Sequence, residues 1–362
     1  MPISKSDIEQ KLGQIIDPNM ETDLVSSKSV KAIKQDGDNW KIEIQLGYPA
    51  AGYFDELKQA IRTSLSDLDA IGEVEVEVSS KIKSHAVQQN LKPLKGIKNV
   101  IAVASGKGGV GKSTTAVNLA LALQVEGATV GILDADIYGP SIPRMLGCKG
   151  QPESSDGKSL EPMIGHGVQS MSIGYLVEED TPMIWRGPMV TQALEQLLND
   201  TNWNDIDYLI VDLPPGTGDI QLTLAQRIPV SGAVIVTTPQ DIALLDARKG
   251  LKMFEKVEVP VLGVIENMSI HICTKCGHNE HIFGEGGGNR LSEEHGVDLL
   301  GSLPLDIRIR EQADSGNPTV AAMGDSHISK IYRQIARRTA AKLATMARDH
   351  SAAFPSIVIQ NN

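Results

Sequence analysis

The segment from Gly106 to Thr114 has the pattern of a loop that binds phosphate. Its sequence, GKGGVGKST, fits G-x-x-x-x-G-K-[ST] and follows the apolar run Val100–Ala104 directly. Glycines let the backbone turn its amides toward an anion, so Lys112 is expected to reach the β- and γ-phosphates and the Ser113 hydroxyl to ligate Mg²⁺. The pattern predicts a bound nucleotide, and the alternative is a glycine-rich turn without one. The predicted nucleotide-binding residues of this loop are Gly106, Lys107, Gly108, Gly109, Val110, Gly111, Lys112, Ser113 and Thr114.

Acidic residues end two further apolar runs. Asp134 follows Val130–Leu133, and Asp212 follows Tyr208–Val211. Ligands of parallel sheets bind beside the carboxyl ends of the strands, so both strand ends are places where chemistry is expected. Asp212 is expected to hold Mg²⁺ through water. For Asp134, an acidic cap on a strand end is the alternative.

A pair of thiols lies further along the chain, in the segment Cys273-Thr-Lys-Cys276-Gly-His278. Two thiolates spaced by two residues can bind one metal, because the turn brings both sulfurs to one side. A structural zinc site completed by His278 and His281 is one interpretation, and a redox dithiol is another. An iron–sulfur cluster usually needs four thiolates, so it requires a second, symmetry-related chain. The third cysteine, Cys148, has no nearby sulfur or histidine in the sequence and is predicted to be non-ligating.

Composition narrows the class of protein. The chain has 362 residues and a formal charge of −11, with 41% hydrophobic and 22% charged residues, as in folded globular proteins. The net negative charge disfavours extensive electrostatic binding to nucleic acid or to an anionic membrane. We find no run of about 20 apolar residues and no apolar signal core near the amino terminus, which predicts a cytoplasmic protein without a membrane span. Three cysteines are too few for a disulfide framework.

Residues 1–80 are predicted to form a small α+β domain. A capping box of Ser6 and Glu9 is expected to start a first helix. Val30–Gln35 and Trp40–Leu46 flank an Asp-Gly-Asp turn and predict a hairpin. Apolar residues at helical spacing follow between residues 54 and 65, and Val74, Val76 and Val78 alternate with glutamates as a last strand.

Residues 81–98 are predicted to be a basic linker. They contain five lysines and no acidic residue, namely Lys81, Lys83, Lys92, Lys95 and Lys98. A solvated linker and a docking site for an acidic partner both fit this run.

From residue 99 to 350 the pattern changes to that of a P-loop α/β domain, and residues 351–362 are left as a carboxyl-terminal tail. Five short apolar runs alternate with helix-length segments: Val100–Ala104, Val130–Leu133, Tyr208–Val211, Ala233–Val236 and Val261–Ile265. Such runs are typical of a mostly parallel sheet covered by helices on both faces.

The loop sequence KGGVGKS resembles the deviant Walker A loop of the MinD/ParA class of ATPases. The resemblance implies that Lys107 contacts ATP across a dimer interface and that Lys112 and Asp136 also act in hydrolysis, Asp136 by orienting the attacking water. It places Asp134 near Mg²⁺ and matches Asn267 and Pro304 to the segments that contact the base. The alternative for Lys107 is a solvated side chain without a role in binding. The alternative for Asn267 and Pro304 is a structural role in the turns that follow strands.

The order of motifs over nearly the whole chain resembles the iron–sulfur cluster carrier ATPases of the Mrp/ApbC type. The motifs include SGKGGVGKST, DADIYGPS, VDLPPGTGD, TTPQ, ENMS, CTKCGH and IFGEGGG. This resemblance implies a homodimer that holds a labile [4Fe–4S] cluster between Cys273 and Cys276 of both subunits. It further implies ATP hydrolysis coupled to cluster transfer, with cluster donors and apo iron–sulfur proteins as partners. The amino-terminal region looks like a small metal–sulfur cluster assembly domain, but residues 48–54 contain no cysteine, so we expect a docking or regulatory role.

A positioning ATPase of the MinD/ParA kind, with structural zinc at the thiol pair, is the main alternative. Its feature would be a membrane- or DNA-binding terminal helix. Apolar residues at helical spacing do occur near the end of the chain, at Ile328, Ile331, Ile335, Leu343 and Met346. This stripe lacks Trp and Phe, and we expect it to pack on the ATPase domain. Nitrogenase-type reductases also bridge a cluster between P-loop subunits, but their paired cysteines are far apart in sequence.

Overall fold

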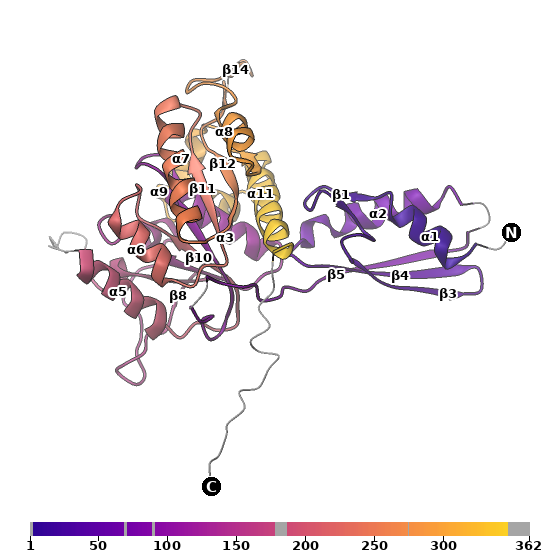
Figure 1. Ribbon diagram of the computed structural model, residues 1–362, viewed down its shortest axis with the longest axis horizontal. Helices are drawn as coiled ribbons and strands as arrows, with labels where there is room; N and C mark the ends of the chain where they lie inside the picture. Colours follow the sequence, from indigo (N-terminus) through magenta and orange to yellow (C-terminus); the bar gives the residue numbers. More distant parts are fainter. Residues whose placement is uncertain (1–2, 69–70, 89–90, 178–186, 274, 347–362) are drawn as a thin grey trace, which may run out of the picture.

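An eight-stranded sheet forms the centre of the larger domain in the computed structural model (Figure 1). The structure describes residues 3–68, 71–88, 91–177, 187–273 and 275–346. Only the pair β8–β9 is antiparallel among the described strand pairs of this sheet, and the predicted fold class is confirmed. In spatial order the strands are β15 (Leu299–Ser302), β12 (Val261–Glu266), β11 (Gly232–Thr237), β6 (Ile97–Ala104), β10 (Ile206–Asp212), β7 (Val130–Asp134), β9 (Val168–Ser172) and β8 (Met163–Gly165).

Helices cover both faces of this sheet. Because strand side chains alternate, Ile101 and Val103 of β6 pack toward α3 and α11, whereas Val100 and Ala102 pack toward α5, α6 and α7. The longer helices are α3 (Lys112–Val125), α5 (Gly187–Asp200), α6 (Asp219–Arg227), α7 (Asp241–Lys256), α8 (Gly287–His295) and α11 (His327–Ala344). The short ones are α4 (Ile142–Met145), η2 (Ile173–Tyr175), α9 (Ile307–Asp314) and α10 (Thr319–Ala322).

The amino-terminal elements form a small module that extends from the larger domain (Figure 1). Its three-stranded sheet has the order β3-β4-β5, and β4 alternates buried and less buried residues as predicted. The hairpin, the helix and the last strand of the prediction are all present. The elements of this small module are α1 (Lys5–Leu12), β1 (Ile16–Asp17), β2 (Thr22–Asp23), β3 (Val30–Asp36), β4 (Asn39–Leu46), η1 (Ala51–Tyr53), α2 (Phe54–Leu65) and β5 (Val74–Ser80).

The predicted capping box at Ser6 and Glu9 is wrong. Ser4 caps α1 instead, with extended backbone angles, and its hydroxyl accepts the amide proton of Asp7. The Asp7 carboxylate in turn accepts the Ser4 amide proton at 2.8 Å. The box forms two residues earlier because Asp serves at the third helical position in place of Glu.

The terminal helix α11 buries its apolar face in the protein, as expected. Ile328, Ile335 and Leu343 are at most 3% exposed and lie in the core with α3 and β15. This packing removes the stripe that a membrane-binding helix would have to present. None of the described helices is long and apolar enough to cross a bilayer. The predicted tail, residues 351–362, lies outside the described residues.

Glu126 joins the small module to the larger domain. It follows α3 directly, its side chain is fully buried, and one carboxylate oxygen lies 2.7 Å from Arg333 Nε and 2.9 Å from Arg337 Nη1. The other oxygen accepts the amide proton of Gly52 in η1 at 2.9 Å. A Cβ at Gly52 would come within 1.8 Å of the Arg333 guanidinium, so a side chain there would displace this guanidinium from its present position.

Replacement of Glu126 by Ala is expected to lower the free energy of unfolding by about 2–4 kcal/mol. Removing one partner of a buried ion pair costs about 3–5 kcal/mol, and the two arginines, 20% and 16% exposed, recover part of this through water. Urea denaturation measures the change. As a control, Glu9→Ala removes an exposed pair with Lys5 and is expected to cost less than about 1 kcal/mol. Equal losses in the two variants would contradict the role given to Glu126.

Candidate functional site

The loop between β6 and α3 has the geometry of a phosphate cradle. Gly111 caps α3 in the left-handed conformation (φ 82°), so the first amides of the helix face the loop. A Cβ on Gly111 would lie 2.2 Å from Asn267 Nδ2, and one on Gly106 would lie 2.2 Å from the Asp246 carbonyl carbon. Both positions therefore exclude a side chain, and the loop is clamped between α7 and the end of β12.

Lys112 lies at the centre of this site. Its ammonium is 2.5 Å from Asp212 Oδ1 and 3.1 Å from Ser113 Oγ, and its side chain is 6% exposed. The second carboxylate oxygen of Asp212 is buried, and no described residue gives it a hydrogen bond. The Asp212 carboxylate and the Ser113 hydroxyl both contact the Lys112 ammonium, and oxygens of these two kinds are suited to Mg²⁺, so these residues fit the metal that a nucleotide would bring.

Asp134 is adjacent to Asp212 because β7 and β10 are paired in register there. Its carboxylate accepts hydrogen bonds from the amides of Ser141 and Ile142 at 3.1 Å and from the Ser172 hydroxyl at 3.0 Å. Burial, followed by the nearby Asp212, raises the pKa of Asp134. The observed contacts make Asp134 the anchor of residues 136–142, and the sequence patterns did not point to Ser172.

Asp136 begins this anchored loop. Its amide donates to Asp134 Oδ1 at 3.2 Å, and its half-buried side chain lies near Lys112 and Asp212. Burial raises the pKa of the Asp136 carboxyl, with Lys112 opposing the shift. The structure thus groups Asp136 with Lys112 and Asp212 at one edge of the sheet.

Lys107 extends toward α7 rather than toward Asp212. Its ammonium is 3.5 Å from Gln240 Oε1, and its carbonyl accepts the Ser105 hydroxyl at 2.9 Å. Gln240 caps α7 and was not among the predicted site residues, although it ends the TTPQ motif. The loop that follows Asp212 lies beside Ser105, because the Gly216 amide donates to the Ser105 carbonyl at 3.0 Å.

Asn267 connects the loop to the chain that leads to the thiols. Its amide nitrogen donates to the Val110 carbonyl at 2.9 Å, and its oxygen accepts the Met268 amide proton at 2.9 Å. The structure therefore places Asn267 against the phosphate-binding loop. Pro304 is buried just after β15, where the neighbouring Leu305 amide donates to the Ile270 carbonyl at 2.8 Å.

The thiol pair lies at the tip of a short hairpin, β13 (His271–Ile272) and β14 (Asn279–Glu280), which projects from the larger domain (Figure 1). The Cys273 amide donates to the His278 carbonyl at 2.9 Å, and the Gly277 amide donates to the Cys273 carbonyl at 2.8 Å. Amide protons of Cys276 and Lys275, and then the Cys276 side chain, lower the pKa of the Cys273 thiol. The turn thus favours the thiolate, the form that binds metal. Cys273 is half-buried and Cys276 is exposed.

The histidines near this hairpin do not complete a metal site within the described part of one chain. His281 Nδ1 bonds the Ser269 carbonyl at 3.0 Å, and its Nε2 lies 3.7 Å from Glu285. No group of three or more His, Cys, Asp or Glu among the described residues is arranged to hold a metal ion. Cys148 is half-buried against both core clusters and contacts the Leu146 carbonyl at 3.8 Å.

The parallel sheet, the loop and the strand-end acids together define a P-loop NTPase. A family model described as "NUBPL iron-transfer P-loop NTPase" matches residues 96–340, and one described as "Iron-sulfur cluster assembly protein" matches residues 5–78. The chain therefore belongs to the NUBPL-type iron-transfer P-loop NTPases, and the family resemblance stated from its motifs is confirmed.

Similar proteins carry consistent names. An "Iron-sulfur cluster carrier protein" of Haemophilus influenzae is 51% identical over 94% of this chain and 92% of its own length. The "Iron-sulfur cluster transfer protein NUBPL" of Mus musculus is 53% identical over 70% of this chain and 80% of its own length.

Solved structures agree on the fold. A nucleotide-binding protein of Archaeoglobus fulgidus, in complex with ADP, is 38% identical, with a TM-score of 0.54 over 61% of this chain and 88% of its own. MinD of Pyrococcus furiosus is 22% identical, with a TM-score of 0.51 over 66% of this chain and 97% of its own, and shows the fold alone.

Proposed function

We propose that the protein carries a [4Fe–4S] cluster on Cys273 and Cys276 as a homodimer and transfers it to apo iron–sulfur proteins, with ATP hydrolysis coupled to the transfer. The observation that carries the proposal is the two-thiol turn, with Cys273 half-buried and Cys276 exposed, on the same domain as the phosphate-binding loop. The names of the relatives support the same function. A positioning ATPase is less well supported, because α11 buries its apolar stripe.

The homodimer follows from the number of thiolates. A cubane cluster takes four, each chain offers two in one place, and a twofold axis supplies the rest. Exposed apolar side chains lie near both sites: Ile242 and Leu245 on α7, and Ile272 and Ile282 beside the hairpin. Such side chains suit a face that a second copy covers.

Coupling between the two sites has a short path through the chain. Asn267 bonds the phosphate-binding loop, and Cys273 follows it by only six residues. Between them, the Ser269 amide donates to the Leu303 carbonyl at 3.0 Å, and the Ser269 carbonyl accepts from His281. Movement of the loop around phosphates is thereby transmitted to both arms of the hairpin.

A transfer assay tests this function. Protein reconstituted without oxygen is mixed with the apo form of a [4Fe–4S] hydratase, and recovery of hydratase activity is followed with ATP, with a non-hydrolysable analogue and without nucleotide. Activity is expected to recover, at a rate that differs among the three conditions. Failure to transfer any cluster from loaded protein would contradict the carrier function.

Subunit complementation tests the role of Lys107 across the interface. We expect mixed dimers of a Lys107→Ala chain and a Lys112→Ala chain to hydrolyse ATP at roughly half the wild-type rate. The Lys107→Ala subunit keeps its own Lys112 and receives Lys107 from its partner, so one of the two sites is complete. Each variant alone is expected to be inactive. Mixed dimers as inactive as the parents would show that Lys107 acts within its own subunit.

A further inference from the structure

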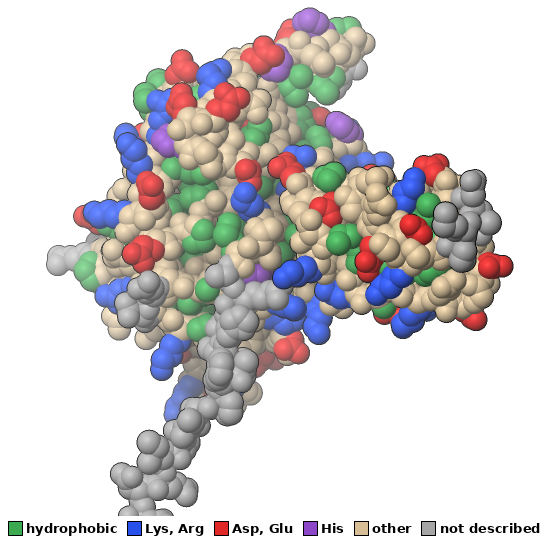
Figure 2. All heavy atoms as spheres, turned by 45° about the vertical axis from the view of Figure 1, so that its right-hand side comes forward, with side chains coloured by type: hydrophobic (Ala, Val, Ile, Leu, Met, Phe, Trp, Pro, Cys, Tyr) green, Lys and Arg blue, Asp and Glu red, His purple; other side chains and the backbone are tan. Residues whose placement is uncertain are grey.

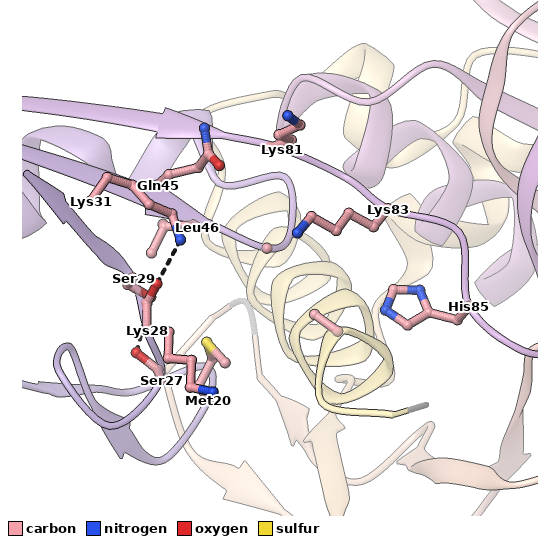
Figure 3. A pocket seen from close by; sticks show the side chains of 12 residues that line it. Met20, Ser27, Lys28, Ser29, Lys31, Gln45, Leu46, Lys81, Lys83 and His85 are labelled. Atoms are coloured by element: carbon pink, nitrogen blue, oxygen red, sulfur yellow. Dashed lines mark hydrogen bonds between the residues drawn. The ribbon is translucent and has the colours of Figure 1, made fainter. Parts of the chain in front are cut away.

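A basic pocket of about 170 Å³ lies where the small module, the linker and the end of α11 meet (Figure 3). Figure 3 shows Lys81, Lys83 and His85 of the linker on one side and Ser27, Lys28 and Ser29 of the small module on the other. Lys31 also lines it, and its described lining contains no Asp or Glu. In a chain of net charge −11 this concentration of cations is unusual. Figure 2 shows blue side chains gathering at this junction.

On the side of the small module, Lys28 and Lys31 supply the cationic side chains of the pocket. Lys28 adopts the left-handed conformation (φ 58°), where glycine or asparagine is less strained than lysine. Its carbonyl holds the Lys31 ammonium at 2.7 Å, which leaves that ammonium two further donors. The hydroxyls of Ser27 and Ser29 lie 2.9 Å apart, and Ser29 is 3% exposed.

The linker wall is held in place from both domains. The Lys81 amide donates to the Leu46 carbonyl of β4 at 2.9 Å, and Asn99 of β6 donates through Nδ2 to the Lys83 carbonyl at 2.9 Å. Asn99 is 1% exposed, and its oxygen accepts the His85 amide proton at 3.0 Å. This half of the lysine-rich run is therefore fixed around a cavity, which a merely solvated linker does not explain.

We propose that this pocket binds a small polyvalent oxyanion of the phosphate or carboxylate class. Lysines of two separate segments line the cavity, and ammonium groups form charge-assisted hydrogen bonds to anionic oxygens. A cavity of about 150 Å³ holds a benzene-sized molecule, so the volume suits such an anion. A bound anion would neutralise lysines of the small module and the linker together and would fix the two domains relative to each other. The inference does not depend on cluster transfer.

Isothermal titration calorimetry on the full chain tests the site, with inorganic phosphate and tricarballylate as separate probes at constant ionic strength. Saturating Mg·ADP is present throughout, because the phosphate-binding loop would otherwise bind phosphate. We expect saturable binding of at least one probe, and Lys28→Gln and Lys81→Gln each to weaken it by about tenfold, the loss of one charge-assisted hydrogen bond.

Lys34→Gln is the matched control. Lys34 lies on β3 and pairs with Glu43 at 2.6 Å outside the pocket, so its loss is expected to leave binding unchanged. Whichever probe binds more tightly identifies the class of anion. Absence of binding to the wild type, or equal affinities for wild type, Lys28→Gln and Lys81→Gln, would overturn the proposal. Circular dichroism confirms that the variants, all at surface lysines, are folded.

Discussion

Replacement of Cys273 or Cys276 by Ala is expected to abolish iron and sulfide binding after anaerobic reconstitution. Wild-type protein is expected to hold about two irons and two sulfides per chain, half of a shared cubane. Each variant removes half of the thiolates that a dimer contributes, and the described residues of one chain contain no group of three or more His, Cys, Asp or Glu arranged to hold a metal ion. Iron and acid-labile sulfide are measured per chain.

Cys148→Ala is the matched control for this prediction. Cys148 is half-buried among apolar side chains and lies far from the hairpin in sequence, so its loss is expected to leave the iron content unchanged. Equal iron in all three variants would refute the assignment of the cluster to the hairpin. One zinc and no sulfide per chain in the wild type would favour the structural zinc site instead.

Replacement of Lys112 by Ala is expected to reduce ATP hydrolysis by about 10²–10³-fold or more. The ammonium is the cation that the structure places between the loop and Asp212, and loss of one such preorganised charge costs a factor of this size in rate. Phosphate release is the measurement. Iron and sulfide content should stay at the wild-type value, because the two sites use different side chains.

Lys249→Ala is the control for general effects of removing a lysine. Lys249 is exposed on α7 and pairs only with the nearby Asp246 in the described structure, so hydrolysis is expected to be unchanged. Wild-type hydrolysis in Lys112→Ala would contradict the nucleotide site. Loss of iron in the same variant would contradict the separation of the two sites.

The core of the fold was predictable because its central strands are buried on both faces. β6, β7, β10, β11 and β12 appear in the sequence as continuous apolar runs. β8, β9 and β15 were not predicted. β9 has buried polar residues, including Ser170 and Ser172, whose hydroxyls bond Tyr175 and Asp134, and such a network conceals the apolar pattern of a strand.

The loop and the thiol pair were recognisable because each motif is local. Their supporting residues were not, because these come from distant parts of the chain. Gln240 reaches Lys107 across 133 residues, and Arg337 reaches Glu126 across 211 residues. Nor does any sequence pattern place Lys28 and Lys81 at one cavity. Contacts of this kind depend on how the elements pack.

Native mass spectrometry of protein reconstituted without oxygen is the most direct test of the central claim that two chains share one cluster. The account predicts one species with the mass of two chains and four irons with four sulfides, which separates into cluster-free monomers when the iron is chelated. A monomer that retains an intact cluster would contradict it.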